Sequence, residues 1–220
     1  MSRSEVGLAV FDLDGTLTRR DTLFPYALGF LRESPGTMPG ALLRLPLPVI
    51  AGAIRGDRGE VKSAVIRICL GGSTREQIDE WNARFVPQLL QRGMHQDALS
   101  RLEEHKRAGA RLILLSASTD LYVPAIGTAL GFHETVCTGV RWNGERLDGH
   151  LTTANRRAEE KARCVAEIRA RYPGLRAAAY GNAGSDLAHL RLVEEPLLVN
   201  GSAAARHQAR QLGIPCARWH

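Results

Sequence analysis

Residues 6–18 read Val6-Gly7-Leu8-Ala9-Val10-Phe11-Asp12-Leu13-Asp14-Gly15-Thr16-Leu17-Thr18, and this stretch decides the fold. Its apolar run, residues 8–11, predicts a buried β-strand. Asp12 and Asp14 follow two residues apart, and residues with that spacing in a strand point to the same face. Gly15 then permits a sharp turn. Two converging carboxylates at the end of a buried strand need a cation or a proton to compensate their charge, so the stretch predicts a chemical site.

The composition is that of a globular chain with a basic balance. Its 220 residues suit one domain, or a core domain with an inserted segment. The net charge is +6, and most positive charges are arginines because the only lysines are Lys62, Lys106 and Lys161. This balance either reflects a compositional habit of the source or favours phosphate-rich partners, including anionic membrane surfaces. No basic patch interleaved with aromatic residues is present, so we expect no nucleic-acid partner.

The cysteines and the first residues suggest a place in the cell. The four cysteines are scattered, without a Cys-x-x-Cys pair, which is typical of reduced thiols and argues against a disulfide framework or a zinc site. Residues 1–5 lead directly into the first strand without a signal-peptide pattern, and no apolar run reaches the ~20 residues of a membrane span. We therefore expect a cytoplasmic protein.

Residues 19–90 have helical patterning between the first strand and the next one. A connection this long is unusual as a plain loop, but it suits an inserted lid. Its oddest part is the apolar segment 41–54, which Arg44, Pro46 and Pro48 interrupt. Two interpretations stay open for this segment. It forms either the buried seam of a helical subdomain or a surface that enters a membrane interface or receives an acyl chain.

Helices and strands alternate after residue 90, which predicts a parallel α/β sheet. Strands are expected at residues 111–118, 177–180 and 197–200. Open sheets of this kind place their sites at the C-terminal ends of the strands. Ser116 ends the first of these strands, where a hydroxyl and free backbone amides suit a phosphoryl oxygen. A serine at a strand end is also a common turn residue.

Lys161 stands in the first turn of the predicted helix that ends at Arg171. Its compact ammonium suits a position beside a carboxylate and a phosphate better than a guanidinium fork does. On its own, a solvated lysine paired with Glu159 or Glu160 would be the better interpretation, but the position and context of Lys161 favour the site. Asn155, a few residues earlier, and Arg157 are further candidates for contact with phosphate.

Four short stretches, in this order along the chain, resemble the motifs of the haloacid dehalogenase-like hydrolase superfamily. The stretches are Asp12-Leu13-Asp14-Gly15-Thr16-Leu17-Thr18, the strand ending in Ser116, the helix start at Lys161, and Gly181-Asn182-Ala183-Gly184-Ser185-Asp186. The resemblance implies a Rossmann-like three-layer sandwich with a parallel sheet as a core domain, residues 1–18 and 91–220. It also implies that residues 19–90 form an inserted helical cap of the C1 type that closes over the site and selects the substrate.

The resemblance further implies a Mg²⁺-dependent phosphatase. Asp12 would attack phosphorus and form an aspartyl-phosphate, and Asp14 would act as general acid and then as general base. Ser116, the backbone at Ala117 and Lys161 would hold the phosphoryl oxygens, and Thr16 would hold the loop or the departing group. The implied metal-binding residues are Asp12, the backbone carbonyl of Asp14, Asn182 and Asp186.

Asn182 departs from the family pattern, which has an acidic residue at this position. An amide oxygen can still coordinate magnesium, but the site loses one negative charge. Asp186 would then carry more of the metal binding, directly or through water. The alternative from another functional class is a non-catalytic phosphate-binding protein of the same family.

The substrate is open at this stage. The early helical cap resembles subfamily IB, the phosphoserine phosphatase-like group. Within it, residues 155–161 and the apolar cap are more similar to phosphatidylglycerophosphatase C-like members, which implies a phospholipid headgroup phosphate such as phosphatidylglycerophosphate and a peripheral membrane contact through residues 41–54. The alternative is a phosphatase of phosphoserine or another small phosphorylated metabolite.

Overall fold

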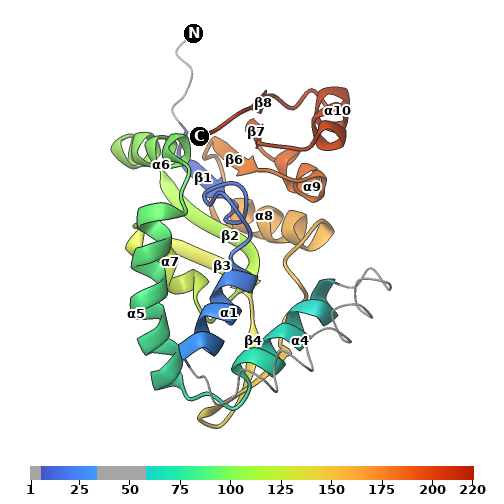
Figure 1. Cartoon of the computed structure of the whole chain (residues 1–220). Coiled ribbons are helices and arrows are strands. Elements are labelled where there is room, and N and C mark those ends of the chain that lie inside the picture. Colours follow the sequence, from blue (N-terminus) through green and yellow to red (C-terminus); the bar gives the residue numbers. More distant parts are fainter. Residues whose placement is uncertain (1–5, 34–57) are drawn as a thin grey trace.

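The computed structural model describes residues 6–33 and 58–220. Six parallel strands form its central sheet, in the order β3-β2-β1-β6-β7-β8 (Figure 1). The strands are β1 (Leu8–Phe11), β2 (Arg111–Thr119), β3 (Glu134–Thr138), β6 (Ala177–Gly181), β7 (Glu195–Val199) and β8 (Cys216–Ala217). The predicted parallel α/β fold is thus confirmed, with β1 paired on both sides, by β2 and by β6.

Both faces of the sheet are covered, which makes three layers. Along β1 the side chains alternate between two apolar cores: Ala9 and Phe11 belong to one, Leu8 and Val10 to the other. The first core is covered by α6 (Gln96–Arg107) and α7 (Val123–Ala129). The second is covered by α8 (Glu159–Arg171), α9 (Leu187–Leu190) and α10 (Ala203–Gln211), on the other side of the sheet in Figure 1.

Three described helices follow β1 and precede α6 in the chain: α1 (Leu23–Glu33), α4 (Arg58–Leu70) and α5 (Arg75–Arg92). Their apolar residues are continuous with the first core. Tyr26 of α1 lies 4.3 Å from Tyr122, ring centroid to centroid, and Phe85 of α5 packs edge-on against Tyr26 at 5.0 Å. These helices are therefore docked on the core by aromatic packing. The division into a core and a cap domain stays a prediction, and the apolar segment 41–54 lies outside the described residues.

A second, two-stranded sheet packs against α4. It is the antiparallel hairpin of β4 (Val140–Asn143) and β5 (Arg146–Leu151). The chain reverses within two residues after Asn143, at Gly144, whose φ is +58°, so β5 begins at Arg146. The Ser63 hydroxyl of α4 donates to the Gly149 carbonyl of β5 at 3.2 Å. The hairpin thus connects α4 to the segment that leads into α8.

In the described part of the chain, no helix combines the length and the apolar character needed to cross a membrane.

Candidate active site

The end of β1 brings Asp12 and Asp14 into one cavity of about 810 Å³. Beyond the strand the chain turns tightly, and the amides of Thr16, Leu17 and Thr18 all donate to the Leu13 carbonyl at 2.9–3.2 Å. Gly15 has a φ of +79°, and a Cβ there would lie 2.0 Å from Nδ2 of Asn182. Only glycine fits both the left-handed backbone and the close approach of the Asn182 side chain. The turn therefore holds residues 12–18 against the loop that contains Asn182.

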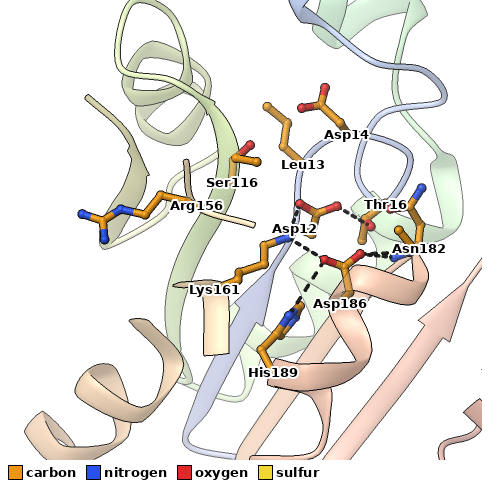
Figure 2. A network of polar contacts seen from close by, with 12 residues as sticks. Asp12, Leu13, Asp14, Thr16, Ser116, Arg156, Lys161, Asn182, Asp186 and His189 are labelled. Carbon is orange, nitrogen blue, oxygen red and sulfur yellow. Dashed lines mark hydrogen bonds and ion pairs between the residues drawn. The ribbon is translucent and has the colours of Figure 1, made fainter. Parts of the chain in front are cut away.

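Lys161, from the first turn of α8, is the counter-charge of two buried carboxylates (Figure 2). Its Nζ lies 2.6 Å from Oδ1 of Asp12 and 2.9 Å from Oδ1 of Asp186. All three side chains are almost fully buried, with exposures of 3%, 7% and 5% for Lys161, Asp12 and Asp186. At such burial water screens the ion pairs poorly. Removing any one of the three charges would therefore leave a buried charge without full compensation.

The remaining donors divide unequally between the two carboxylates. Asp186 accepts the backbone amides of Asn182 and Ala183 at 3.0 and 2.9 Å, whereas Asp12 accepts the Thr16 hydroxyl at 2.9 Å. Burial raises the pKa of Asp12 to about 7 against the opposing charge of Lys161, and the charge of Asp186 adds to the rise. Burial acts on Asp186 in the same direction, but Lys161 and the amides outweigh it and lower its pKa to about 2. Asp12 is thus the carboxylate for which a further cation would matter most.

Asp14 is held by hydroxyl and amide donors from two other segments. Oδ1 accepts both the amide and the hydroxyl of Thr22 at 2.7 Å, and Oδ2 accepts the Ser118 hydroxyl at 2.6 Å. The Thr22 hydroxyl also contacts the Tyr122 hydroxyl at 2.9 Å. Burial raises the pKa of Asp14, with a contribution from the charge of Asp21, although these hydrogen bonds oppose it. A carboxyl whose pKa is raised and which lies in a cavity suits proton transfer.

The end of β2 supplies backbone groups to the same cavity. The pairing of β2 with β3 becomes irregular between Leu115 and Thr119, which releases this stretch from the regular ladder. Ser116 is fully buried, and its hydroxyl oxygen accepts the Ser118 amide at 3.0 Å. Among the predicted residues, Ala117, Asn155 and Arg157 line the cavity. Thr16 and Ser116 are fully buried and do not line it. The Thr16 hydroxyl donates to Oδ2 of Asp12 at 2.9 Å, and its expected contact with a departing group stays a prediction.

A second lysine, Lys62, reaches the cavity from α4. Only 8% of its surface is exposed, and its Nζ donates to Oδ1 of Asn155 at 2.6 Å and to the Ala117 carbonyl. That carbonyl also accepts the Thr138 hydroxyl at 2.7 Å. Because these partners of Lys62 are uncharged oxygens, burial lowers its pKa to about 8. Sequence reasoning missed Lys62 as a site residue, along with Ser118 and Thr22; the rarity of lysine in the chain was the one available signal.

The electrostatic balance of the cavity fits a divalent cation and a phosphate. Arg19, Arg20, Arg58 and Arg157 line it together with the two lysines, and Asp12, Asp14, Asp21 and Asp186 are its acidic residues. The described residues contain no ready-made group of three His, Cys, Asp or Glu side chains that could hold a metal. Magnesium often needs only one or two carboxylates, with neutral oxygens and waters completing its shell. Asp12, Asp186, the Asn182 amide and a backbone carbonyl form such a donor set, and the raised pKa of Asp12 marks the uncompensated charge.

These features define an α/β protein whose polar site lies at the C-terminal edge of a parallel sheet. The model of the haloacid dehalogenase-like hydrolase family matches residues 9–191, and the chain belongs to that family.

Known relatives and structures agree with this assignment. The chain is 31% identical to the protein CicA of Caulobacter vibrioides over 190 residues, which cover 86% of this chain and 83% of that protein. A protein of unknown function from Bordetella pertussis has the same fold, with a TM-score of 0.80 at 21% identity, over 95% of this chain and 96% of that one. A substrate-bound phosphoserine phosphatase superposes with a TM-score of 0.66 at 16% identity, over 97% and 93% of the two chains.

Proposed function

We propose that the protein is a Mg²⁺-dependent phosphomonoester hydrolase that acts through an aspartyl-phosphate. The observation that carries the proposal is the buried Asp12–Lys161–Asp186 cluster in one cavity with Asp14. A nucleophilic carboxylate, a second carboxyl for proton transfer and a fixed cation are the groups that phosphoryl transfer to an enzyme residue requires.

In the proposed mechanism, Asp12 attacks phosphorus in line, its oxygen forms the new P–O bond, and the bond to the leaving alkoxide breaks. Asp14 gives its proton to that alkoxide and later takes a proton from the water that hydrolyses the aspartyl-phosphate. Lys161 and backbone amides at the end of β2 stabilise the charge on the equatorial oxygens. A bound Mg²⁺, held by Asp12, Asp186, the Asn182 amide oxygen and the Asp14 carbonyl, would supply further charge neutralisation.

The test of the proposal is hydrolysis of p-nitrophenyl phosphate, with and without magnesium. We expect turnover that stops in EDTA and returns when magnesium is added. Phosphate binding without any turnover would instead favour the non-catalytic phosphate-binding alternative.

We further propose a substrate with an apolar portion next to its phosphate. Leu23, Phe24 and Val61 line one part of the cavity, and Phe24 is 39% exposed although it is a large apolar side chain. Together with the resemblance to subfamily IB and to phosphatidylglycerophosphatase C-like proteins, this supports a phospholipid headgroup phosphate such as phosphatidylglycerophosphate. A cytoplasmic protein that contacts the membrane peripherally would meet such a substrate. Faster hydrolysis of phosphoserine than of phosphatidylglycerophosphate in mixed micelles would contradict this proposal and favour the small-metabolite alternative.

Asn182→Asp is expected to strengthen magnesium binding. The substitution keeps the side-chain shape against Gly15 and adds one carboxylate to a donor set of hard oxygens. We expect the magnesium concentration for half-maximal activity to fall by about tenfold, which corresponds to about 1.4 kcal/mol. Asn143→Asp, at an exposed asparagine of the β4–β5 hairpin that lines neither this cavity nor its neighbour, is the matched control. An unchanged magnesium requirement in Asn182→Asp would exclude residue 182 as a ligand.

Lys62 is expected to make substrate binding depend on pH. In its charged form it fixes the Ala117 peptide and adds a positive charge to the cavity, and with its pKa near 8 it loses that charge as the pH rises. The wild-type KM should therefore rise through pH 8, whereas Lys62→Met should have a KM about tenfold higher at pH 7 that no longer changes in this range. Lys106→Met, which removes an exposed ion pair with Glu103, is the control. The same rise of KM in Lys62→Met and wild type would assign the titration to another group.

A further inference from the structure

A second cavity, of about 920 Å³, adjoins the catalytic one. It lies between the first motif, the residue before α6, the start of α10 and the segment around β8. The two cavities share Gly15, Arg19 and Asn182 in their walls, so a ligand in one would lie beside the other. The proposed phosphatase mechanism uses none of the residues that line only the second cavity.

The lining of this second cavity is strongly cationic. Arg19, Arg206 and Arg218 contribute its positive charge, and none of the described side chains that line it is that of Asp or Glu. Within residues 6–33 and 58–220, Arg19 and Arg218 make no side-chain hydrogen bond or ion pair, and Arg206 donates only to the Gly201 carbonyl. Guanidinium groups that surround one hollow repel each other, and a bound anion would reverse this repulsion. Their planar donor forks match the oxygens of a phosphate.

The walls of the second cavity are fixed by hydrogen bonds and packing. Asn200 joins two of them: its Nδ2 lies 3.1 Å from Nε2 of His95, and its Oδ1 accepts the Trp219 amide at 2.9 Å. Trp219 is buried and packs on Tyr180, with ring centroids 5.4 Å apart. Asn200 adopts a φ of +52°, a conformation that asparagine tolerates better than most residues. These contacts therefore fix the backbone segments from which the side chains of the cavity project.

We propose that the second cavity is an anion-binding site for a phosphate group, separate from the catalytic phosphate site. Two sources share this chemistry. The anion is either free inorganic phosphate or a second phosphoryl group of a substrate that extends from the catalytic cavity past Arg19. The second source rests on the proposed phosphatase function, whereas the binding site itself does not.

Calorimetric titration with inorganic phosphate in EDTA tests the site. EDTA removes any bound metal, and a double variant that changes residues of the second cavity alone assigns the measured binding to that cavity. We expect one phosphate to bind wild type, and the Arg206→Ala/Arg218→Ala double variant to bind it at least about tenfold more weakly. The control is Arg191→Ala/Arg210→Ala, which removes the same charge from exposed arginines that line neither cavity. Equal affinity in the two double variants, or no binding to wild type, would overturn the proposal.

Kinetics with alkanediol monophosphates and bisphosphates of graded chain length distinguish the two sources. If the anion is part of the substrate, the Arg206→Ala/Arg218→Ala variant should lose about tenfold in kcat/KM for a bisphosphate of matching length and keep its value for the monophosphate. If the anion is free phosphate, both substrates should be affected alike while the titration still shows the loss of binding. Absence of all hydrolysis by wild type would contradict the phosphatase proposal and leave the titration as the test of the site.

Discussion

Asp12→Asn is expected to lower kcat for p-nitrophenyl phosphate by about 10⁴-fold or more, since loss of a nucleophile removes the step that all later chemistry needs. The amide has the shape of the carboxylate but cannot form the acyl phosphate. Lys161 keeps its ion pair with Asp186 at 2.9 Å, so the variant should fold. Asp97→Asn, a change at an exposed carboxylate on α6, controls for the loss of one charge.

The stability of Asp12→Asn provides an independent check. In the metal-free wild type the pKa of Asp12 is raised from its ordinary value to about 7, so the folded protein holds this proton more tightly than the unfolded chain does. The stability that comes from this proton is present below about pH 4 and is lost as the pH rises through about 7. In the variant, the amide that replaces the Asp12 carboxyl cannot titrate. We therefore expect the melting temperature in EDTA to fall less between pH 5 and about pH 8 in Asp12→Asn than in wild type. Parallel curves would contradict the raised pKa.

Lys161→Met is expected to destabilise the protein by about 3–5 kcal/mol, because it leaves buried carboxylates without their counter-charge. The side chain of Lys161 is 3% exposed and touches both Asp12 and Asp186, so water cannot replace it readily. Activity should be lost as well. Urea denaturation in EDTA at pH 7 measures the free energy of unfolding directly.

The double variant Lys161→Met/Asp12→Asn separates charge from packing. Removing one of the two carboxylates should restore part of the lost stability, since the single changes act on one ion-paired cluster and do not add. In Lys161→Met alone, the pKa values of both carboxyls rise, so stability should decrease as the pH increases above about 4. If the single and the double variant unfold at the same urea concentration, the loss comes from packing and not from charge.

Much of the site was predictable because the fold brings together the C-terminal ends of parallel strands. The apolar runs before Asp12 and Asn182 predict β1 and β6, and these strands are neighbours. The sheet therefore places the first and fourth motifs side by side, and the helix start at Lys161 points into the same place.

Other contacts depend on packing that no local pattern encodes. Lys62 stands in a helix whose apolar residues predict the helix but not a place for the lysine in the site, and it reaches Asn155 across 93 residues. At the end of β2 the sequence offers several small hydroxyl residues and does not show which of them reaches Asp14. In the structure Ser118 donates to Asp14, within the stretch where the pairing of β2 with β3 is irregular. Thr22 becomes a partner of Asp14 because α1 docks through Tyr26 on Tyr122. These contacts follow from how the inserted helices sit on the core.

Mass spectrometry of the protein after rapid acid quench during turnover tests the central claim most directly. An aspartyl-phosphate is stable enough in acid to be found on the peptide that contains Asp12. We predict a phosphoryl group on Asp12 in wild type incubated with substrate and magnesium, and none in Asp12→Asn or in EDTA. Substrate turnover without any phosphorylated Asp12, under conditions where a phosphorylated standard peptide survives the quench, would contradict the account.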